Sequence, residues 1–182
     1  MRVTVIGRGN VGGGLARLWR AAGHEVQELG RDGGDATGAG AVLLAVPGDR
    51  IADALGSVRG LEGVPVIDAT NATRGRPAGF DSLAQYVGSL TGGPVAKAFN
   101  TNFASIYDRL GEAASRPTMV YAADEGAREV TERLIADAGY EPVDAGDLGS
   151  ARAVEDFLAV IFAVSRTGLG PFFYRFAPPD RL

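Results

Sequence analysis

The sequence predicts an α/β fold of the Rossmann type, a doubly wound and mostly parallel sheet with a short C-terminal helical segment. Three observations lead to this prediction. A β-branched run at Val3–Ile6 is followed by the glycine motif Gly-x-Gly-x-x-Gly at Gly7–Gly12. The residues after the motif repeat with a helical period, and short apolar runs then alternate with helical patterns along the chain. This alternation is typical of a parallel sheet with helices on both faces.

The glycine motif predicts a loop that holds the pyrophosphate of a nucleotide cofactor. Gly7 would allow the tight turn, Gly9 would let the backbone approach the pyrophosphate, and Gly12 would let helix and strand pack closely. The pyrophosphate would lie at the positive end of the helix dipole. A purely structural turn is the alternative, which the position between a strand and an amphipathic helix disfavours. The expected binding residues are Gly7, Arg8, Gly9, Asn10, Val11 and Gly12.

The end of the second predicted strand, at Gly30 and Arg31, bears on the choice of cofactor. NAD enzymes usually place Asp or Glu here to hold the ribose 2′-hydroxyl. Without that carboxylate a 2′-phosphate is not repelled, and the Arg31 guanidinium can hold it through two hydrogen bonds. Arg31 could instead be a solvated surface residue, and a register shifted by two residues would bring Glu28 to this position and favour NAD. We favour NADP.

Composition excludes several classes of function. The chain has 182 residues, which suits one domain with an appendage, and 46% of them are hydrophobic. Its net charge of −4 argues against binding to nucleic acid or anionic membranes. Cysteine is absent and the single histidine, His24, lies in a predicted turn, so we expect neither a metal site nor a catalytic triad. With no signal peptide or spanning segment expected, a cytoplasmic location is predicted.

The remaining elements follow in order. Gly30–Gly40 reads as a loop, and the continuous apolar run Ala41–Val46 as a strand buried on both faces. Residues 71–80 are polar and read as a loop, and Asp124 is a plausible N-cap. Further strands are expected at 64–68, 95–99, 118–122 and 140–143, and further helices at 49–55, 80–90 and 124–138. About seven or eight strands result.

The last part of the chain differs from the rest. We place the nucleotide-binding domain at residues 1–147 and a C-terminal helical segment at residues 148–182. Residues 150–176 read as a helix that is apolar nearly all round and broken near Gly168–Pro171. One apolar face would suffice to cover a sheet, so the surplus predicts a partner subunit or a pocket wall, with extra core packing as the alternative.

Ligands of such sheets lie across the carboxyl ends of the strands. Polar and apolar residues at these ends form the expected rim, with Lys97 either holding an anionic ligand or forming an ion pair with Asp68. The rim has few acid–base groups, whereas carbonyl reduction normally needs a proton donor. Hydride transfer to a ring such as a flavin or deazaflavin needs mainly stacking of two rings. The rim segments are Gly30–Arg31, Ala45–Pro47, Asp68–Asn71 and Lys97–Asn102.

Together these segments resemble the F420-dependent NADP oxidoreductase family, over nearly the whole chain. The more specific elements are Val95–Thr101 and Asp144–Arg152, which join Gly7–Ala16, Ala22–Glu25, Gly30–Arg31 and Ala45–Pro47. The resemblance implies an NADP-binding Rossmann domain, often dimeric, that exchanges hydride between NADPH and a deazaflavin. It also implies that residues bordering the nicotinamide are Ala45, Val46, Pro47, Ala98, Phe99 and Asn100. We add Asn71 to the cofactor contacts, and Lys97 and Asn102 to the substrate contacts.

The sequence departs from this family at three places. Arg8 stands where relatives commonly have a small Ser or Thr, Gly30 replaces a small polar residue, and residues 71–94 are shortened. These departures bear on the hydride acceptor rather than on fold or cofactor. Two other functions are therefore considered: an NADPH-dependent reductase of a flavin, imine or quinone, and a non-catalytic NADP(H)-binding sensor. No residue of this chain is assigned a catalytic role.

Overall fold

The main sheet has the strand order of a doubly wound fold. The computed structural model describes residues 1–181. Its seven strands lie in the order β2-β1-β4-β6-β7-β8-β9, and every neighbouring pair is parallel except β7 with β8. The predicted Rossmann-type sheet is therefore confirmed. The strands are β1 (Arg2–Ile6), β2 (Glu25–Leu29), β4 (Ala41–Leu44), β6 (Val66–Asp68), β7 (Val95–Lys97), β8 (Thr118–Ala123) and β9 (Glu141–Asp144).

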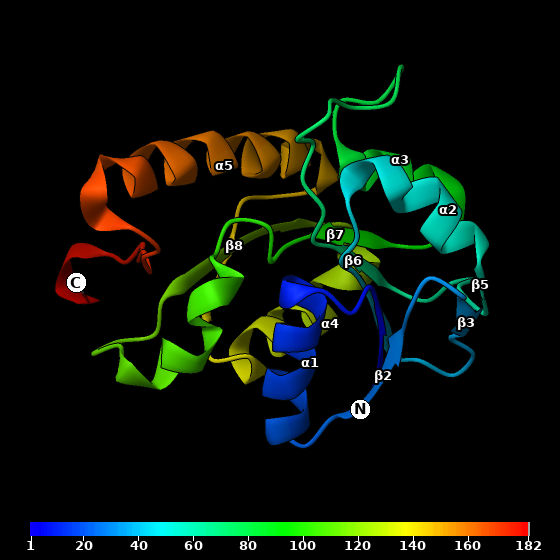
Figure 1. Cartoon of the computed structure of the whole chain (residues 1–182), viewed down its shortest axis with the longest axis horizontal. Helices are drawn as coiled ribbons and strands as arrows, with labels where there is room; N and C mark the ends of the chain where they lie inside the picture. The colour runs from blue at the N-terminus through cyan, green and yellow to red at the C-terminus, as the bar shows by residue number, and fades with distance from the viewer. Residues whose placement is uncertain (182) are drawn as a thin grey trace.

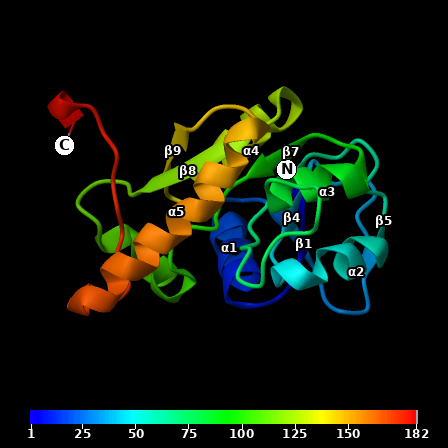
Figure 2. The same ribbon diagram turned by 90° about the horizontal axis from the view of Figure 1, so that it is seen from above.

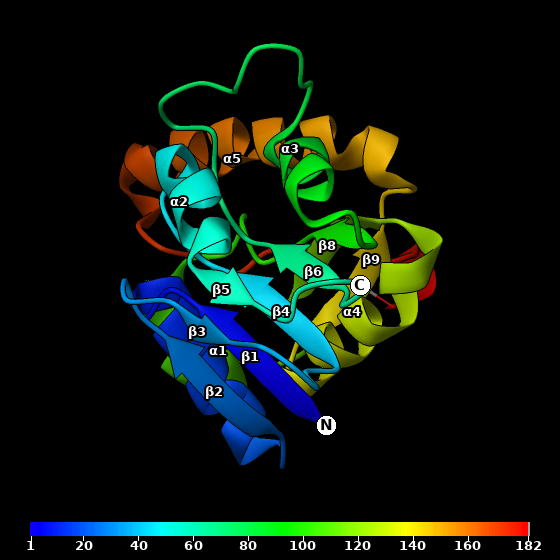
Figure 3. The same ribbon diagram turned by 90° about the vertical axis from the view of Figure 1, so that its right-hand side faces the viewer.

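Helices cover both faces of this sheet (Figures 1 and 3). One face carries α1 (Asn10–Ala21) and α4 (Glu125–Asp137), and the other carries α2 (Ile51–Gly56), α3 (Leu83–Thr91) and α5 (Ala151–Val164). All four residues of β4 are buried, because apolar helices lie above and below it. None of the helices within residues 1–181 is long and apolar enough to cross a membrane.

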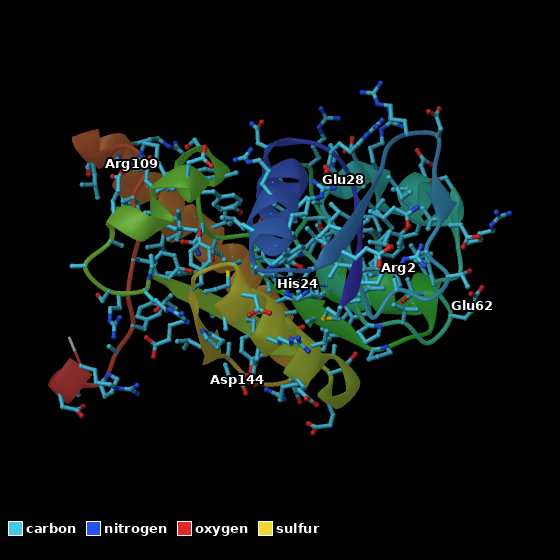
Figure 4. All side chains as sticks on the ribbon, turned by 90° about the horizontal axis from the view of Figure 1, so that it is seen from below. Arg2, His24, Glu28, Glu62, Arg109 and Asp144 are labelled. Atoms are coloured by element: carbon cyan, nitrogen blue, oxygen red, sulfur yellow. The ribbon has the colours of Figure 1, made fainter. Side chains whose placement is uncertain are left out.

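The single tryptophan anchors α1 to α4. Trp19 is fully buried, and its indole Nε1 donates a hydrogen bond of 2.8 Å to the carbonyl oxygen of Leu134. His24 lies in the turn after α1, as predicted, with its Nε2 2.8 Å from Oδ2 of Asp137 (Figure 4). These contacts join two helices on the same sheet face.

The structure differs from the sequence prediction in three local features. The predicted loop Gly30–Gly40 contains β3 (Gly34–Asp35), which pairs with an unexpected strand, β5 (Val58–Arg59). Two-residue strands are too short for a periodic pattern. A long 3₁₀ segment, Ala104–Glu112, was also not predicted. Asp124 is the N-cap residue of α4, as predicted, but its carboxylate accepts a hydrogen bond from the backbone N–H of Val95 rather than from the first turn of the helix.

The C-terminal segment is helical over a shorter range than predicted. The helix α5 and a π-turn at Ser165–Leu169 are followed by extended chain through Phe176 (Figure 2). Gly168 and Gly170 have positive φ, which ends the helix. The extended part lies beside β8, where the N–H of Thr118 donates to the carbonyl oxygen of Tyr174 at 2.8 Å. The backbone of residues 172–176 is therefore held by the sheet rather than by a helix.

Candidate nucleotide-binding site

The glycine loop joins β1 to α1 through two close backbone approaches. Gly7 has φ 108°, and a Cβ added to it would overlap the carbonyl oxygen of Ala45. A Cβ on Gly12 would overlap the carbonyl oxygen of Gly7, which keeps the first turn of α1 against the strand. A Cβ on Gly9 would meet nothing within 4 Å. The loop is thus packed tightly on the sheet side and open on the other, as a phosphate-binding loop requires.

A cavity of about 260 Å³ opens beside this loop. It lies at the carboxyl ends of β1, β4 and β6, where the chain leaves β1 toward β2 on one side and returns to β4 on the other. Ligands of doubly wound sheets bind at this switch point. Its lining residues, whose side chains are apolar, amide or hydroxyl, are Gly9, Asn10, Val11, Ala45, Val46, Pro47, Gly48, Ala69, Thr70, Asn71 and Thr73.

The register of β2 places Gly30 directly after the strand. The N–H of Gly7 donates to the carbonyl oxygen of Leu29 at 3.0 Å, so Leu29 is the last paired residue. Glu28 (Figure 4) forms an ion pair of 2.7 Å with Arg20 on α1. Arg31 is exposed, and within residues 1–181 it has no acidic partner. The strand end therefore carries a guanidinium without an ion-pair partner. Arg20 neutralises Glu28, whereas Asp32, the exposed residue after Arg31, forms no ion pair among the described residues.

Three residues expected to border the nicotinamide are buried below the cavity. Ala98 and Phe99 are fully buried, and Asn100 is 4% exposed. Phe99 has φ 61°, and its ring packs edge-on against Trp19 with centroids 5.6 Å apart. Asn100 donates from Nδ2 to Oδ1 of Asn71, and Asn71 donates in return to the carbonyl oxygen of Asn100. Of this pair, Asn71 lines the cavity and Asn100 supports it from behind.

The substrate contacts predicted for Lys97 and Asn102 do not fit the structure. Lys97 is fully buried, with its Nζ 2.8 Å from Oδ2 of Asp68 and 3.3 Å from Oε1 of Glu155. The ion-pair alternative is therefore the correct one, and no free ammonium is left for a ligand. Asn102 is 7% exposed and donates from Nδ2 to the carbonyl oxygen of Thr118. Its amide holds the strand β8 rather than a substrate.

Glu155, on α5, links the buried Lys97 to the start of α3 and to Arg76. One oxygen accepts from the N–H of Leu83 at 2.7 Å, at the start of α3, and the other accepts from Nε of Arg76 at 2.9 Å. Burial of a carboxylate is tolerated when such partners surround it. The sequence pattern missed Glu155 because it is followed by Asp156, and the two together read as the solvated positions of an otherwise apolar helix. Its position inside that apolar run was the available signal.

The chain is similar to solved structures, although it matches no protein-family model and no curated sequence. A protein of Arthrobacter sp. FB24, named for an inferred F420-dependent NADP reductase activity, is 24% identical with a TM-score of 0.81, and the match covers 98% of this chain and 100% of that one. A hypothetical protein of Sinorhizobium meliloti is 27% identical with a TM-score of 0.65, covering 83% and 87%.

An imine reductase of Aspergillus terreus, solved with NADPH4 and dibenz[c,e]azepine, is also similar. It is 16% identical with a TM-score of 0.67, and the match covers 93% of this chain and 63% of that one. This chain thus spans less than two thirds of the imine reductase. The three likenesses establish a shared Rossmann-type fold. They agree with the family resemblance that the sequence motifs suggest.

Proposed function

We propose that this chain binds NADP(H) and exchanges a hydride with a small-molecule acceptor. The observation that carries this proposal is the combination of an open glycine loop with a strand that is followed by Gly30, which has no carboxylate, and then by Arg31. Of the three motif glycines, only Gly9 faces open space. The backbone at Gly9 is therefore accessible to a pyrophosphate. NADP(H), when bound, supplies the hydride itself. The chain's own residues bind and orient the dinucleotide.

We further propose a deazaflavin of the coenzyme F420 type as the acceptor. The cavity lining consists of amide, hydroxyl and apolar groups, which suits transfer between stacked rings better than carbonyl reduction with a protein proton donor. The match to the Arthrobacter protein, which is named for the same reaction, covers the whole length of that protein. The alternative acceptor is an imine, which the likeness to the Aspergillus imine reductase favours.

The acceptor is tested by following nicotinamide absorbance. The purified protein is mixed with NADPH and, in separate reactions, oxidised coenzyme F420, FMN, a cyclic imine or a quinone. Turnover that is fastest with F420 supports the proposal, and turnover only with another acceptor replaces F420 by that acceptor. Tight NADPH binding without any turnover contradicts an enzymatic role and favours the sensor.

The cofactor preference is tested by Arg31→Ala. Loss of a charge-assisted contact to the 2′-phosphate should weaken NADPH binding about 10- to 100-fold and leave NADH binding nearly unchanged. Arg109→Ala is the matched control, because Arg109 is an exposed arginine far from Glu28 and the strand end (Figure 4). An equal loss for both nucleotides in Arg31→Ala would refute the role of Arg31.

We also propose that α5 contacts a second copy of the chain. The C-terminal half of α5 exposes large apolar side chains, which a solvated helix would not normally carry. They are Val160, Phe162 and Val164, with Leu169 just beyond the helix. Light scattering should give the mass of a dimer for the natural chain and that of a monomer for Val160→Glu. A monomeric natural chain at micromolar concentration would contradict this proposal.

A further inference from the structure

The side chain of Arg8 occupies the place where residue 30 would have its own. A Cβ built on Gly30 would overlap Nη2 of Arg8 and lie 2.8 Å from Cζ and 2.9 Å from Nε. Real Cβ atoms essentially never come closer than 3.0 Å to such neighbours. Three guanidinium atoms of Arg8 therefore lie against the backbone of Gly30, across the strand end from the glycine loop.

The backbone does not require glycine at position 30. Among the described residues, fourteen glycines have positive φ, and Gly30 is not one of them. Its conformation is one that any residue adopts, so the requirement for glycine here is one of space alone. The neighbour that needs this space is the far end of a flexible side chain. A larger residue at position 30 would displace the Arg8 guanidinium and leave the fold intact.

The charges around Arg8 leave its guanidinium free. Arg8 is exposed, and within residues 1–181 neither it nor Arg31 forms an ion pair. The carboxylate next to Arg31 in sequence, Asp32, is exposed and forms no ion pair in the described part of the chain. The next two, Glu28 and Asp35, are directed elsewhere. Glu28 pairs with Arg20, and Asp35 pairs with Arg59 at 3.0 Å. The Arg8 guanidinium therefore lies at the end of β2, and Arg31 follows Gly30 in the chain; neither arginine has an ion-pair partner among the described residues.

We infer that Arg8 and Arg31 together form the binding site for the 2′-phosphate of an adenine nucleotide, and that Gly30 makes room for Arg8. The inference rests on the proposed binding of NADP(H) and names the residues that select it. A phosphate dianion suits two guanidinium groups, since each can donate two parallel hydrogen bonds. An unphosphorylated ribose offers no such charge. The departures from the family at positions 8 and 30 are then one paired change rather than two separate ones.

The test is a double-mutant cycle read by calorimetric binding, with adenosine 2′,5′-bisphosphate and 5′-ADP as the probes. Arg8→Ser should weaken binding of the 2′,5′-bisphosphate about 10- to 100-fold, the range for one charge-assisted interaction, and leave 5′-ADP within about threefold. Gly30→Ala should produce a similar loss while leaving the thermal midpoint unchanged. In the Arg8→Ser background, Gly30→Ala should have no further effect.

Two results would overturn the inference. One is an Arg8→Ser protein that binds both probes as the natural chain does, or loses both equally. The other is a Gly30→Ala loss of the same size with and without Arg8, which would mean that Gly30 acts through its own backbone. Arg109→Ser serves as the control for a general loss of positive charge.

These binding measurements are independent of turnover. Selective binding of the 2′,5′-bisphosphate that depends on Arg8, without reduction of any acceptor, would support the inference while contradicting the proposed enzyme. Turnover with NADPH that Arg8→Ser leaves unchanged, together with unchanged binding of both probes, would support the enzyme and contradict the inference.

Discussion

Replacing Lys97 by methionine tests whether this residue stabilises the fold or binds a ligand. Its Nζ lies 2.8 Å from Oδ2 of Asp68, 2.6 Å from the carbonyl oxygen of Thr70 and 3.3 Å from Oε1 of Glu155. The side chains of Lys97 and Asp68 are fully buried, and that of Glu155 is 1% exposed. Methionine replaces the aliphatic stem of lysine and removes the charged Nζ, so the packing around the stem of residue 97 changes little.

The expected cost follows from the charges that remain. With Arg76 on the other oxygen of Glu155, the cluster has two positive and two negative groups. Lys97→Met leaves Oδ2 of Asp68 buried without its cation, although Oδ1 still accepts from the N–H of Thr70. Breaking one side of a buried pair costs about 3–5 kcal/mol. For a chain of this size, that lowers the thermal midpoint by about 6–20 °C.

Urea unfolding followed by Trp19 fluorescence measures this loss. The control is Arg50→Met, because the Arg50–Asp53 pair is 66% and 73% exposed and should contribute less than about 1 kcal/mol. The double variant Lys97→Met/Asp68→Asn should recover part of the loss, since the uncompensated charge is removed. A Lys97→Met protein of natural stability that no longer binds its acceptor would refute the structural role and restore the ligand-binding one.

Three further predictions concern the glycine loop, a helix cap and the response to high pH. Gly12→Ala should lower the free energy of unfolding by about 1–3 kcal/mol, because the new Cβ would overlap the carbonyl oxygen of Gly7. Gly9→Ala should cost at most about 1 kcal/mol, because its Cβ would meet nothing within 4 Å. Urea unfolding of the two variants distinguishes these costs. Ser82→Ala removes the acceptor for a backbone N–H at the start of α3 and should cost about 1 kcal/mol; an unchanged urea midpoint would contradict the cap. Burial raises the pKa of Tyr107 and Tyr140 above the ordinary phenol value, so the unfolded chain releases their protons first. Stability should then fall as pH rises above about 10, and equal urea midpoints on either side of that pH would disagree.

Much of the fold could be predicted because its signals are local. The apolar run at Ala41–Leu44 and the glycine motif each specify one element from adjacent residues. The cavity lining was largely predictable for the same reason, since Ala45–Pro47 and Asn71 follow directly after strands. Short elements such as β3 and β5 have no periodicity, and they form only because they pair with each other.

The roles of charged residues depended on contacts between distant parts of the chain. Lys97 meets Glu155 from a helix that begins more than fifty residues later, and no sequence spacing predicts that pairing. The same holds for Glu28, whose position beside the ribose site was left open until Arg20 was seen to neutralise it.

By itself the sequence determined the type of sheet and the glycine loop, because hydrophobic periodicity and glycine conformation act between neighbouring residues. Only the tertiary structure decided which charges are free. It buried Lys97 among carboxylates and placed the Arg8 guanidinium against the backbone of Gly30, the residue before Arg31. The reason is physical: a charge is neutralised or left available by whatever lies within a few ångströms of it in space, wherever that group stands in the chain.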